Sequence, residues 1–376
     1  MKPIRHVAVN TRFLLKGGLE GMGRFTHEIL SRWVKDHPDV QFSFFFDRAF
    51  DPKYIYGPNV KAFVLHPPAR HPFLFYIWFE WRVSAMLRKL KPDVFFSPDG
   101  FLSLRSDTKQ VPVFHDLSFM HYPEDVKKLE ALFYHRYFPL YAKKAARIIV
   151  VSEFTKQDVQ QQFSVSPEKM DVVYNACSAH FHPLTETQQV SARMKFSGGK
   201  RYFYFVGAIQ PRKNLVNLVS AFERFKTETQ SDWKLVIVGR KAWNFEEIIH
   251  SYRDAVHKAD IVFTGYLSDE ELNEVSASAE ALCYVPYFEG FGIPIVEAMQ
   301  AGTAVITSNL SSMPEVAGDA ALFCDPFDSQ SIAEELIRIY KNPAIKAGLI
   351  HKGSLRRTAF SWERSAALAW TTLEKA

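Results

Sequence analysis

Short apolar runs rich in Val, Ile, Phe and Tyr alternate with amphipathic stretches along all 376 residues of the chain. The runs of the first half are HVAVN, QFSFFF, VKAFVL, DVFFSP, VPVFHD, RIIVVS and DVVYN, and those of the second half are YFYFVG, LVIVG, IVFTG, ALCYVP, AVITS and ALFCDP. Runs that are apolar on both faces are typical of parallel strands covered by helices. The pattern therefore predicts an α/β fold built of doubly wound sheets.

The length of the chain and one interruption of this pattern predict two domains. A single hydrophobic core rarely extends beyond about 250 to 300 residues. The segments SAHFHPLTETQQ and SGGK bring polar and turn-forming residues into positions 176–199, which favours a linker there. We expect Rossmann-like domains over residues 1–185 and 186–359, with a final helix over about 360–376 that packs back on the first domain.

The composition favours a folded globular protein, since 47% of the residues are hydrophobic and 15% are aromatic. Cys177, Cys283 and Cys324 lie far apart, in or beside apolar runs, as expected of buried thiols in a reducing cytosol. The N-terminal MKPIRHVAVN lacks the apolar core of a signal peptide, and no run reaches the roughly 20 apolar residues of a transmembrane helix. We expect a cytoplasmic protein that is at most peripheral to a membrane.

The net charge of +5 comes from the first half of the chain. Residues 1–190 contain 25 Lys and Arg against 19 Asp and Glu, whereas residues 191–376 contain 21 against 22. A basic surface suits anionic lipid or an anionic substrate, and a solvated surface without any partner fits it equally well. Without a Lys/Arg block or a known motif we expect no nucleic-acid partner. The stretch HPFLFYIWFEWRVSAMLRKLKPD mixes aromatic and basic residues, which suits either a membrane or lipid-linked acceptor surface, or a core-facing helix.

Candidate site residues follow the strands, because ligands of open α/β sheets bind beyond the carboxyl ends of the strands. KGGLEGMGRF follows the first strand and contains Gly17, Gly18, Gly21 and Gly23 before a helix expected to open at about Arg24. Glycines permit close backbone approach, and a helix N-terminus attracts anions. Both phosphate contact and an ordinary turn fit this segment.

Two further strand ends carry groups with suitable chemistry. QPRKNL places Arg212 and Lys213 where a strand turns into a helix, and both cations have donors suited to phosphate oxygens. VFHDLSF places His115 and Asp116 at a strand end, where a histidine could bond a hydroxyl or act as an acid or base near neutral pH. A solvated basic turn and a structural histidine are the alternatives.

The segment YFEGFGIPIVEAM carries two glutamates around a glycine turn. With Pro294 at the first helical position, Glu297 is expected in the first helical turn, near the same strand end as Glu289. Paired carboxylates suggest glycoside hydrolysis. A helix N-terminus favours ionised carboxylates, however, so acceptors of sugar hydroxyls are the better interpretation. A capping glutamate with an exposed loop glutamate is the simpler alternative.

The sequence contains no Asp-x-Asp, no His-x-x-His and no Gly-x-x-x-x-Gly-Lys-Ser/Thr motif. These motifs would support a metal-anchored or P-loop phosphate site. We therefore expect no metal, and a phosphate held by cations and helix ends.

FVGAIQPRKNL and the segment from GYLSDEEL to ALFCDP resemble the family-four retaining glycosyltransferases of GT-B fold. The spacing of Glu, seven residues and Glu, with Gly-Phe-Gly-x-Pro between, is specific to that group, and bacterial mannosyl- and rhamnosyltransferases of surface-polysaccharide assembly resemble the chain most. The resemblance implies two Rossmann-like domains facing a central cleft. It implies catalytic roles for His115, Glu289, Arg212 and Lys213. It implies donor binding by Gly21, Gly23, Gly207, Tyr266, Leu267, Gly290, Phe291, Gly292 and Glu297.

In this resemblance Glu289 and the glycine turn hold the hydroxyls of the donor sugar, and Glu297 binds the ribose diol. Arg212 and Lys213 clamp the diphosphate, Gly21 and Gly23 approach it from the opposite domain, His115 contacts the sugar near the reacting carbon, and the backbone of Tyr266 and Leu267 touches the nucleobase. The chain departs from the family at two positions. Ala208 stands where an arginine is common, and Asn175-Ala176 replaces Asn-Gly.

The activity implied is retaining, metal-independent transfer of a hexose from a nucleotide diphosphate sugar to a glycan or lipid-linked acceptor. GDP-mannose is favoured as donor over dTDP-rhamnose and UDP-hexoses. The donor is a co-substrate, and no cofactor is expected. A sugar-nucleotide epimerase or phosphorylase on the same scaffold, or a non-catalytic sugar-nucleotide-binding protein, are the alternatives.

Overall fold

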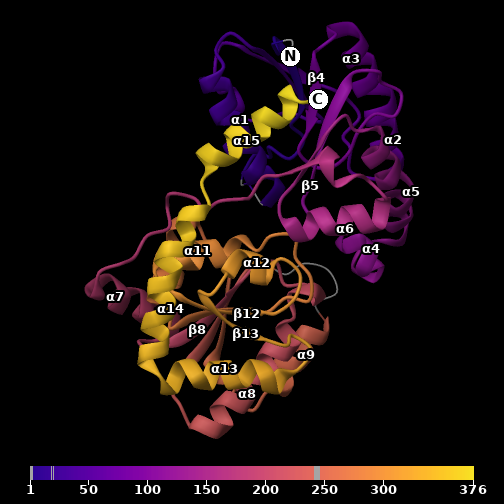
Figure 1. The fold of residues 1–376 in the computed structure, drawn as a ribbon. Helices are drawn as coiled ribbons and strands as arrows, with labels where there is room; N and C mark the ends of the chain where they lie inside the picture. Colours follow the sequence, from indigo (N-terminus) through magenta and orange to yellow (C-terminus); the bar gives the residue numbers. More distant parts are fainter. Residues whose placement is uncertain (1–2, 18, 20, 241–245) are drawn as a thin grey trace. The chain divides into compact units, whose positions relative to one another are not determined.

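The computed structural model describes residues 3–17, 19, 21–240 and 246–376, and the chain divides into two compact units. Unit 1 comprises Met1–Asn175 and Ser361–Ala376, and unit 2 comprises Ala176–Phe360. Each unit is built on one parallel sheet with helices packed against it, so the predicted doubly wound α/β fold is confirmed (Figure 1).

The sheet of unit 1 has seven strands in the order β3-β2-β1-β4-β5-β6-β7, and all its pairs are parallel. Each strand overlaps one of the apolar runs of the first half, although β7 shares only Asp171 and Val172 with the run DVVYN. The strands are β1 (His6–Asn10), β2 (Gln41–Phe46), β3 (Val60–Val64), β4 (Val94–Ser97), β5 (Lys109–Phe114), β6 (Ile148–Val150) and β7 (Met170–Val172).

The helices of unit 1 cover both faces of this sheet. The steps from β1 to β2 and from β3 to β4 run in opposite directions across the sheet, so right-handed crossovers place α1 on one face and α2, α3, α5 and α6 on the other. The helices are α1 (Gly21–Asp36), α2 (Pro72–Ile77), the π-helical turn η2 (Trp78–Val83), α3 (Ser84–Leu90), α4 (Ser118–His121), α5 (Lys128–Lys144), α6 (Glu153–Phe163) and α15 (Trp362–Glu374).

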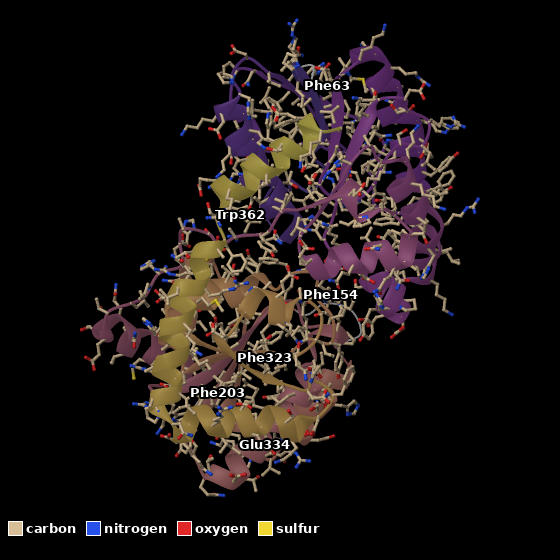
Figure 2. All side chains as sticks on the ribbon, viewed as in Figure 1. Phe63, Phe154, Phe203, Phe323, Glu334 and Trp362 are labelled. Atoms are coloured by element: carbon tan, nitrogen blue, oxygen red, sulfur yellow. The ribbon has the colours of Figure 1, made fainter. Side chains whose placement is uncertain are left out.

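The last helix, α15, packs against α1 in unit 1 (Figure 1). The indole Nε1 of Trp33 donates to the carbonyl of Ala366 at 2.8 Å, and Arg32 forms a 2.7 Å ion pair with Glu363. The hydrogen bond from Arg32 lowers the pKa of Glu363 to about 2. Trp362, at the start of this helix in Figure 2, is buried.

The sheet of unit 2 has six parallel strands in the order β10-β9-β8-β11-β12-β13. The aromatic ring of Phe203, labelled in Figure 2, packs in its core at 5.3 Å from Phe225. The strands are β8 (Tyr202–Val206), β9 (Lys234–Val238), β10 (Ile261–Gly265), β11 (Ala281–Tyr284), β12 (Ala304–Ser308) and β13 (Ala321–Cys324).

The helices of unit 2 include one that the sequence interpretation missed. Residues 176–199 were expected to form a linker, but Thr185 begins α7 with a capping box to Gln188. This part of the linker prediction is wrong, because a polar stretch can equally be a solvated helix. The helices are α7 (Glu186–Ser197), α8 (Leu215–Thr229), α9 (Glu246–Asp254), α10 (Asp269–Ser278), α11 (Ile293–Ala301), α12 (Met313–Ala317), α13 (Ser329–Lys341) and α14 (Pro343–Arg356).

Cys283 and Cys324 are buried free thiols as expected, whereas Cys177 is partly exposed. Among the helices of residues 3–17, 19, 21–240 and 246–376, none is both long and apolar enough to cross a bilayer.

Candidate active site

Two cations and one carboxylate meet at the carboxyl edge of the unit 2 sheet. Arg212 and Lys213 lie on the short 3₁₀ turn η5 (Pro211–Lys213) after β8, and Glu289 lies in the loop after β11. Arg212 Nη1 donates to Glu289 Oε1 at 2.6 Å, and Lys213 Nζ forms an ion pair with the same oxygen. The three side chains are only 12–14% exposed. Two cations sharing one carboxylate favour an anionic ligand.

The surrounding groups hold this cluster in place. Lys213 Nζ also donates to the hydroxyl of Tyr284 at 2.7 Å, and burial raises the pKa of that phenol, so it stays neutral. The backbone of Glu289 is bonded by two serines: its N–H donates to Ser311 Oγ at 3.2 Å, and its carbonyl accepts from Ser312 Oγ at 2.8 Å. The sequence interpretation missed these three residues. The position of Tyr284 at the end of a predicted strand was a usable signal for it.

Asn214 fixes the turn that carries the two cations. Its φ is +61°, a left-handed conformation that asparagine tolerates better than most residues. Its side-chain Nδ2 donates to the carbonyl of Val285 at 2.9 Å and to that of Pro326 at 2.7 Å. These bonds tie η5 to the residues that follow β11 and β13, so the turn that carries the two cations is held against the ends of the sheet.

The turn before α11 requires glycine at position 292. Gly292 has φ +94°, and a Cβ at this position would lie 2.7 Å from Cε of Met313. The helix begins at Ile293, so Pro294 is its second residue. Glu297 is therefore in the second turn, and the prediction that it lies in the first turn is wrong. It remains nearly buried, at 9% exposure.

Gly290 and Phe291 complete this turn. The side chain of Phe291 is buried, with its ring 5.6 Å from that of Phe360 in an edge-on contact. A donor could therefore meet Phe291 through its backbone, which is the role that the resemblance implies.

Gly207, at the end of β8, lies beside the cation cluster. A Cβ on Gly207 would lie 3.8 Å from Cε of Lys213. The backbone of Gly239, after β9, approaches Gly207 so closely that a Cβ on Gly239 would lie 1.8 Å from the Gly207 carbonyl oxygen. Gly207 and Lys213 are thus neighbours in the structure, as their predicted roles require.

Tyr266 and Leu267 are not part of this cluster. They follow β10, which is separated from β8 by β9 in the sheet. At the usual spacing of strands this is about 10 Å. Tyr266 is 65% exposed, and a long ligand such as a nucleotide sugar would be needed to reach both places.

In unit 1, His115 follows β5 at the carboxyl edge of that sheet. Its Nε2 lies 2.8 Å from the carbonyl of Pro98. A carbonyl only accepts, so Nε2 carries the proton and Nδ1 is left as a hydrogen-bond acceptor. Desolvation by burial lowers the pKa of His115, so the neutral form prevails at pH 7. The neighbouring Asp116 accepts from the N–H of Ser118 at 2.9 Å, a structural bond.

The sequence interpretation missed a buried ion pair near His115. Asp99, after β4, binds Arg12, after β1, and also accepts from Ser97 Oγ at 3.1 Å and from the N–H of Phe101 at 3.2 Å. The Arg12 guanidinium lies within 5.5 Å of the centroids of four aromatic rings. Burial is the larger influence and lowers the pKa of His115, whereas the negative charge of Asp99 raises it.

The glycines of the first strand–helix turn differ in role. α1 begins at Gly21, three residues before the expected start at Arg24. A Cβ on Gly23 would lie 2.6 Å from the carbonyl oxygen of Phe13, so packing within unit 1 already requires glycine there. A Cβ on Gly21 would meet nothing within 4 Å, which leaves this position open to a ligand. Gly18 lies outside the described residues.

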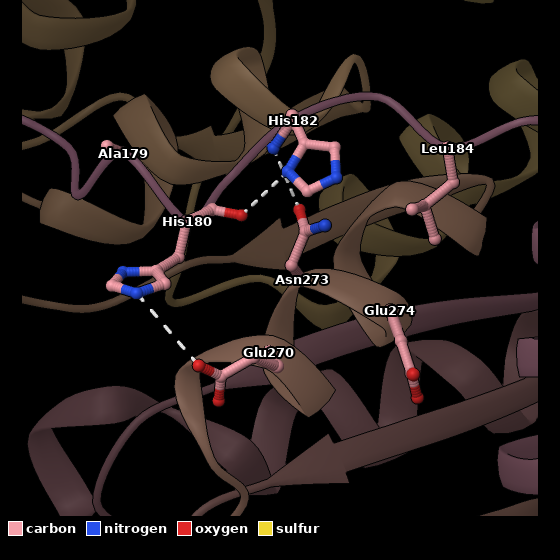
Figure 3. Close-up of a pocket in the computed structure, with 7 residues that line it drawn as sticks. All are labelled: Ala179, His180, His182, Leu184, Glu270, Asn273 and Glu274. Carbon is pink, nitrogen blue, oxygen red and sulfur yellow. Dashed lines mark hydrogen bonds and ion pairs between the residues drawn. The ribbon is translucent and has the colours of Figure 1, made fainter.

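A pocket of about 370 Å³ lies elsewhere in unit 2, between the segment before α7 and helix α10 (Figure 3). Its His180 and Glu270 side chains approach to 3.9 Å, and the N–H of His182 donates to Asn273 at 3.0 Å. None of the predicted site residues lines this pocket. The lining residues are Ala179, His180, His182, Leu184, Glu270, Asn273 and Glu274. In the part of the chain that the structure describes, no three His, Cys, Asp or Glu residues are arranged to hold a metal ion.

Comparison with known proteins places the chain in a family. Residues 186–356 match the model of glycosyl transferases group 1, and residues 19–180 match that of glycosyltransferase family 4. The chain is 26% identical to the O-antigen chain mannosyltransferase B of Escherichia coli, over 93% of this chain and 94% of the relative. It is 25% identical to the O-antigen chain mannosyltransferase RfbU of Salmonella typhimurium, over 76% of each chain.

Solved structures that match the chain over nearly its whole length share its fold. The Anabaena protein HepE, solved with UDP and glucose, superposes with a TM-score of 0.78 at 14% identity, over 99% of this chain and 100% of its own. WaaG, a glycosyltransferase involved in lipopolysaccharide biosynthesis, gives a TM-score of 0.76 at 15% identity, over 96% and 98%. The chain therefore belongs to the group 1, family 4 glycosyltransferases and has their GT-B fold.

Proposed function

We propose that this glycosyltransferase transfers mannose from GDP-mannose to a glycan or lipid-linked acceptor of surface-polysaccharide synthesis, without a metal and with retention of configuration. The observation that carries the proposal is the cluster of Arg212, Lys213 and Glu289 at the carboxyl edge of unit 2. The choice of mannose is supported by the E. coli mannosyltransferase, which matches the chain over nearly its whole length.

In this proposal the cluster binds both the diphosphate and the hexose of the donor. Arg212 and Lys213 bind the diphosphate, Glu289 accepts hydrogen bonds from hexose hydroxyls, and Glu297 accepts from the ribose diol. Charge-assisted hydrogen bonds of this kind are roughly twice as strong as neutral ones. On donor binding, the diphosphate replaces part of the contact that Glu289 now makes with the two cations, which frees the carboxylate for the sugar.

The reaction breaks the bond between the anomeric carbon and a diphosphate oxygen and forms one from that carbon to the acceptor oxygen. Negative charge accumulates on the departing diphosphate, where Arg212 and Lys213 stand. One preorganised donor at such a position contributes about 3–4 kcal/mol to lowering the barrier. The two cations thus supply the charge stabilisation that a divalent metal supplies in other transferases.

Retention follows if the acceptor attacks on the face from which the diphosphate leaves. The proton of the acceptor hydroxyl then passes to the leaving phosphate. This route needs no covalent nucleophile, and Glu289 keeps its role as an acceptor of hydrogen bonds from the hexose hydroxyls. His115, neutral and with Nδ1 as acceptor, suits a hexose hydroxyl rather than proton donation.

Donor identity is tested by thermal shift of the purified chain with GDP-, UDP- and dTDP-sugars, followed by turnover with the best binder. We expect GDP-mannose to raise Tm most. A ligand at 100 times its Kd raises the free energy of unfolding by about 2.7 kcal/mol. For domains of this size, that raises Tm by about 5–10 °C. Epimerised or hydrolysed donor without acceptor would identify an epimerase instead, and binding without turnover by any acceptor would indicate a sugar-nucleotide-binding protein.

Turnover is expected to survive excess EDTA, because the charge stabilisation comes from Arg212 and Lys213. The initial rate is measured with excess EDTA and without it, and the two rates should agree within about twofold. A loss of activity that Mg²⁺ or Mn²⁺ restores would contradict the metal-independent mechanism.

A further inference from the structure

The pocket of about 370 Å³ in unit 2 lies between α10 and the segment that leads into α7 (Figure 3). α10 begins with a capping box between Ser268 and Glu271, and α7 begins with one between Thr185 and Gln188. The two helices also pack against each other. Capping fixes the helix ends beside the pocket, so its lining residues are held in place. The volume is at the lower end of the roughly 300–1,000 Å³ that small-molecule sites occupy.

Asn273 brings an unpaired hydrogen-bond donor into this pocket. The residue is only 3% exposed, and its Oδ1 accepts from the N–H of His182 at 3.0 Å. A backbone N–H only donates, so this bond assigns the oxygen and the nitrogen of the amide. In the part of the chain that the structure describes, Nδ2 has no hydrogen-bond partner, and it points into the pocket on the side of Leu184 (Figure 3). A nearly buried donor without a partner favours a ligand that accepts a hydrogen bond.

The other polar groups of the pocket are mostly acceptors. Glu270 and Glu274 contribute two carboxylates from α10, and Glu274 is held by a 3.0 Å ion pair with Lys195. His182 Nδ1 lies 2.9 Å from the carbonyl of His180, so Nδ1 carries a proton and Nε2 of the neutral ring is an acceptor. A ligand that fits these groups supplies several hydrogen-bond donors and at least one acceptor.

Leu184 gives the pocket an apolar wall. Its side chain packs against a small buried cluster of Phe181, Ala277 and Ala301, which holds it in position. Ala179 adds a second apolar group to the lining. Small-molecule sites combine an apolar wall with a few polar groups that orient the ligand. The apolar C–H face of a sugar ring suits such a wall, and its hydroxyls suit the carboxylates and the amide.

The charge of the pocket argues against other classes of small ligand. A phosphate or a nucleotide would meet the negative charges of Glu270 and Glu274. For a metal ion, the described residues offer no group of three His, Cys, Asp or Glu arranged to hold it. A neutral ligand with many hydroxyl groups satisfies both the acceptors and the one donor.

We propose that this pocket binds a neutral saccharide, namely a sugar unit of the glycan that the enzyme extends. Its hydroxyls donate to Glu270 and Glu274, a sugar oxygen accepts from Asn273 Nδ2, and the ring lies on Leu184. None of the residues assigned to the donor lines the pocket, so this sugar is not the hexose that is transferred. The identification with the acceptor glycan rests on the function proposed above, whereas saccharide binding itself does not.

The test is saturation-transfer NMR of the full chain with the methyl α-glycosides of mannose, glucose, galactose and rhamnose, in the absence of nucleotide sugar. We expect binding of methyl α-mannoside, and equal binding by Lys213→Ala, whose donor site is altered. Absence of binding by all four glycosides would overturn the proposal, and so would binding that Lys213→Ala abolishes. Pocket binding by another glycoside in place of the mannoside would support this proposal and count against mannose as the transferred sugar.

Glu274→Gln locates the bound glycoside in the pocket. It keeps the size of the side chain but replaces the charged acceptor, so the Kd of the glycoside should rise about tenfold or more. The matched control is Glu228→Gln on α8, which removes the same charge from a carboxylate paired with Lys341 at 3.1 Å, outside the pocket. The control should bind as the parent does. Equal affinity of the parent and both variants would place the glycoside elsewhere, and the proposal would be wrong.

Asn273→Asp tests the unpaired donor. Aspartate retains an oxygen for the N–H of His182 but cannot donate to the ligand, so the Kd should again rise about tenfold or more. A Tm within a few degrees of the parent shows that this variant is folded. If it does not fold, Glu274→Gln decides alone, because its side chain is 42% exposed and the substitution disturbs no buried contact. Unchanged affinity of folded Asn273→Asp would contradict the proposed site.

Discussion

Lys213→Ala is expected to lower turnover about 100- to 1,000-fold while unit 2 remains folded. The ammonium binds Glu289, and the Cε beside it lies next to Gly207 at the end of β8. One lost donor to a developing oxyanion costs about 3–4 kcal/mol of transition-state stabilisation. The fold should tolerate the change because Glu289 keeps its 2.6 Å bond to Arg212. The rate is measured at saturating donor and acceptor.

The matched control is Lys200→Ala, which removes a lysine of unit 2 whose side chain is 50% exposed and bound to Asp232. It should change turnover by less than twofold, since exposed ion pairs contribute little. A Tm of Lys213→Ala within a few degrees of the parent establishes that the protein is folded. Near-parental turnover of that folded variant would remove Lys213 from the active site.

The strands could be predicted from the sequence because most of them are buried on both faces, whereas the edge strands β3 and β10 are only partly buried. β2 and β12, for example, are apolar or small at almost every position and are buried along almost their whole length. Burial on both faces leaves a continuous apolar run, which no other element of five or six residues produces as clearly. Helix α7 gave no such signal because most of its residues face solvent and only a few are buried.

The candidate site could be predicted only where a charged side chain directly follows a predicted strand. Arg212, Lys213 and Glu289 follow strand ends, and parallel strands bring their carboxyl ends to one edge. That Glu289 bonds both cations directly could not be inferred, because it depends on the turn that Asn214 fixes with its left-handed backbone. Glycines were the weakest evidence: Gly23 is required by the carbonyl of Phe13, a contact that the sequence does not reveal.

Gly239→Ala is expected to be the more damaging of two otherwise similar glycine substitutions. The new methyl group would start 1.8 Å from the Gly207 carbonyl oxygen, so the ends of β8 and β9 must separate by about 1 Å or more. Overpacking and the positive φ of +151° together lower the free energy of unfolding by about 2–5 kcal/mol. For a domain of this size, this lowers Tm by about 4–20 °C. Because Gly207 lies beside Lys213, turnover should fall about 100-fold even below the Tm.

Gly198→Ala separates the steric effect from the backbone effect. Gly198 ends α7 with φ +65°, and a Cβ there would meet nothing within 4 Å. The cost is then the left-handed backbone alone, about 1–2 kcal/mol, and turnover should be that of the parent. The measurements are the Tm and the turnover rate of Gly239→Ala and Gly198→Ala, each compared with the parent. If Gly239→Ala melts and turns over like Gly198→Ala, the two strand ends are free to separate, and the position of Gly207 does not determine that of Lys213.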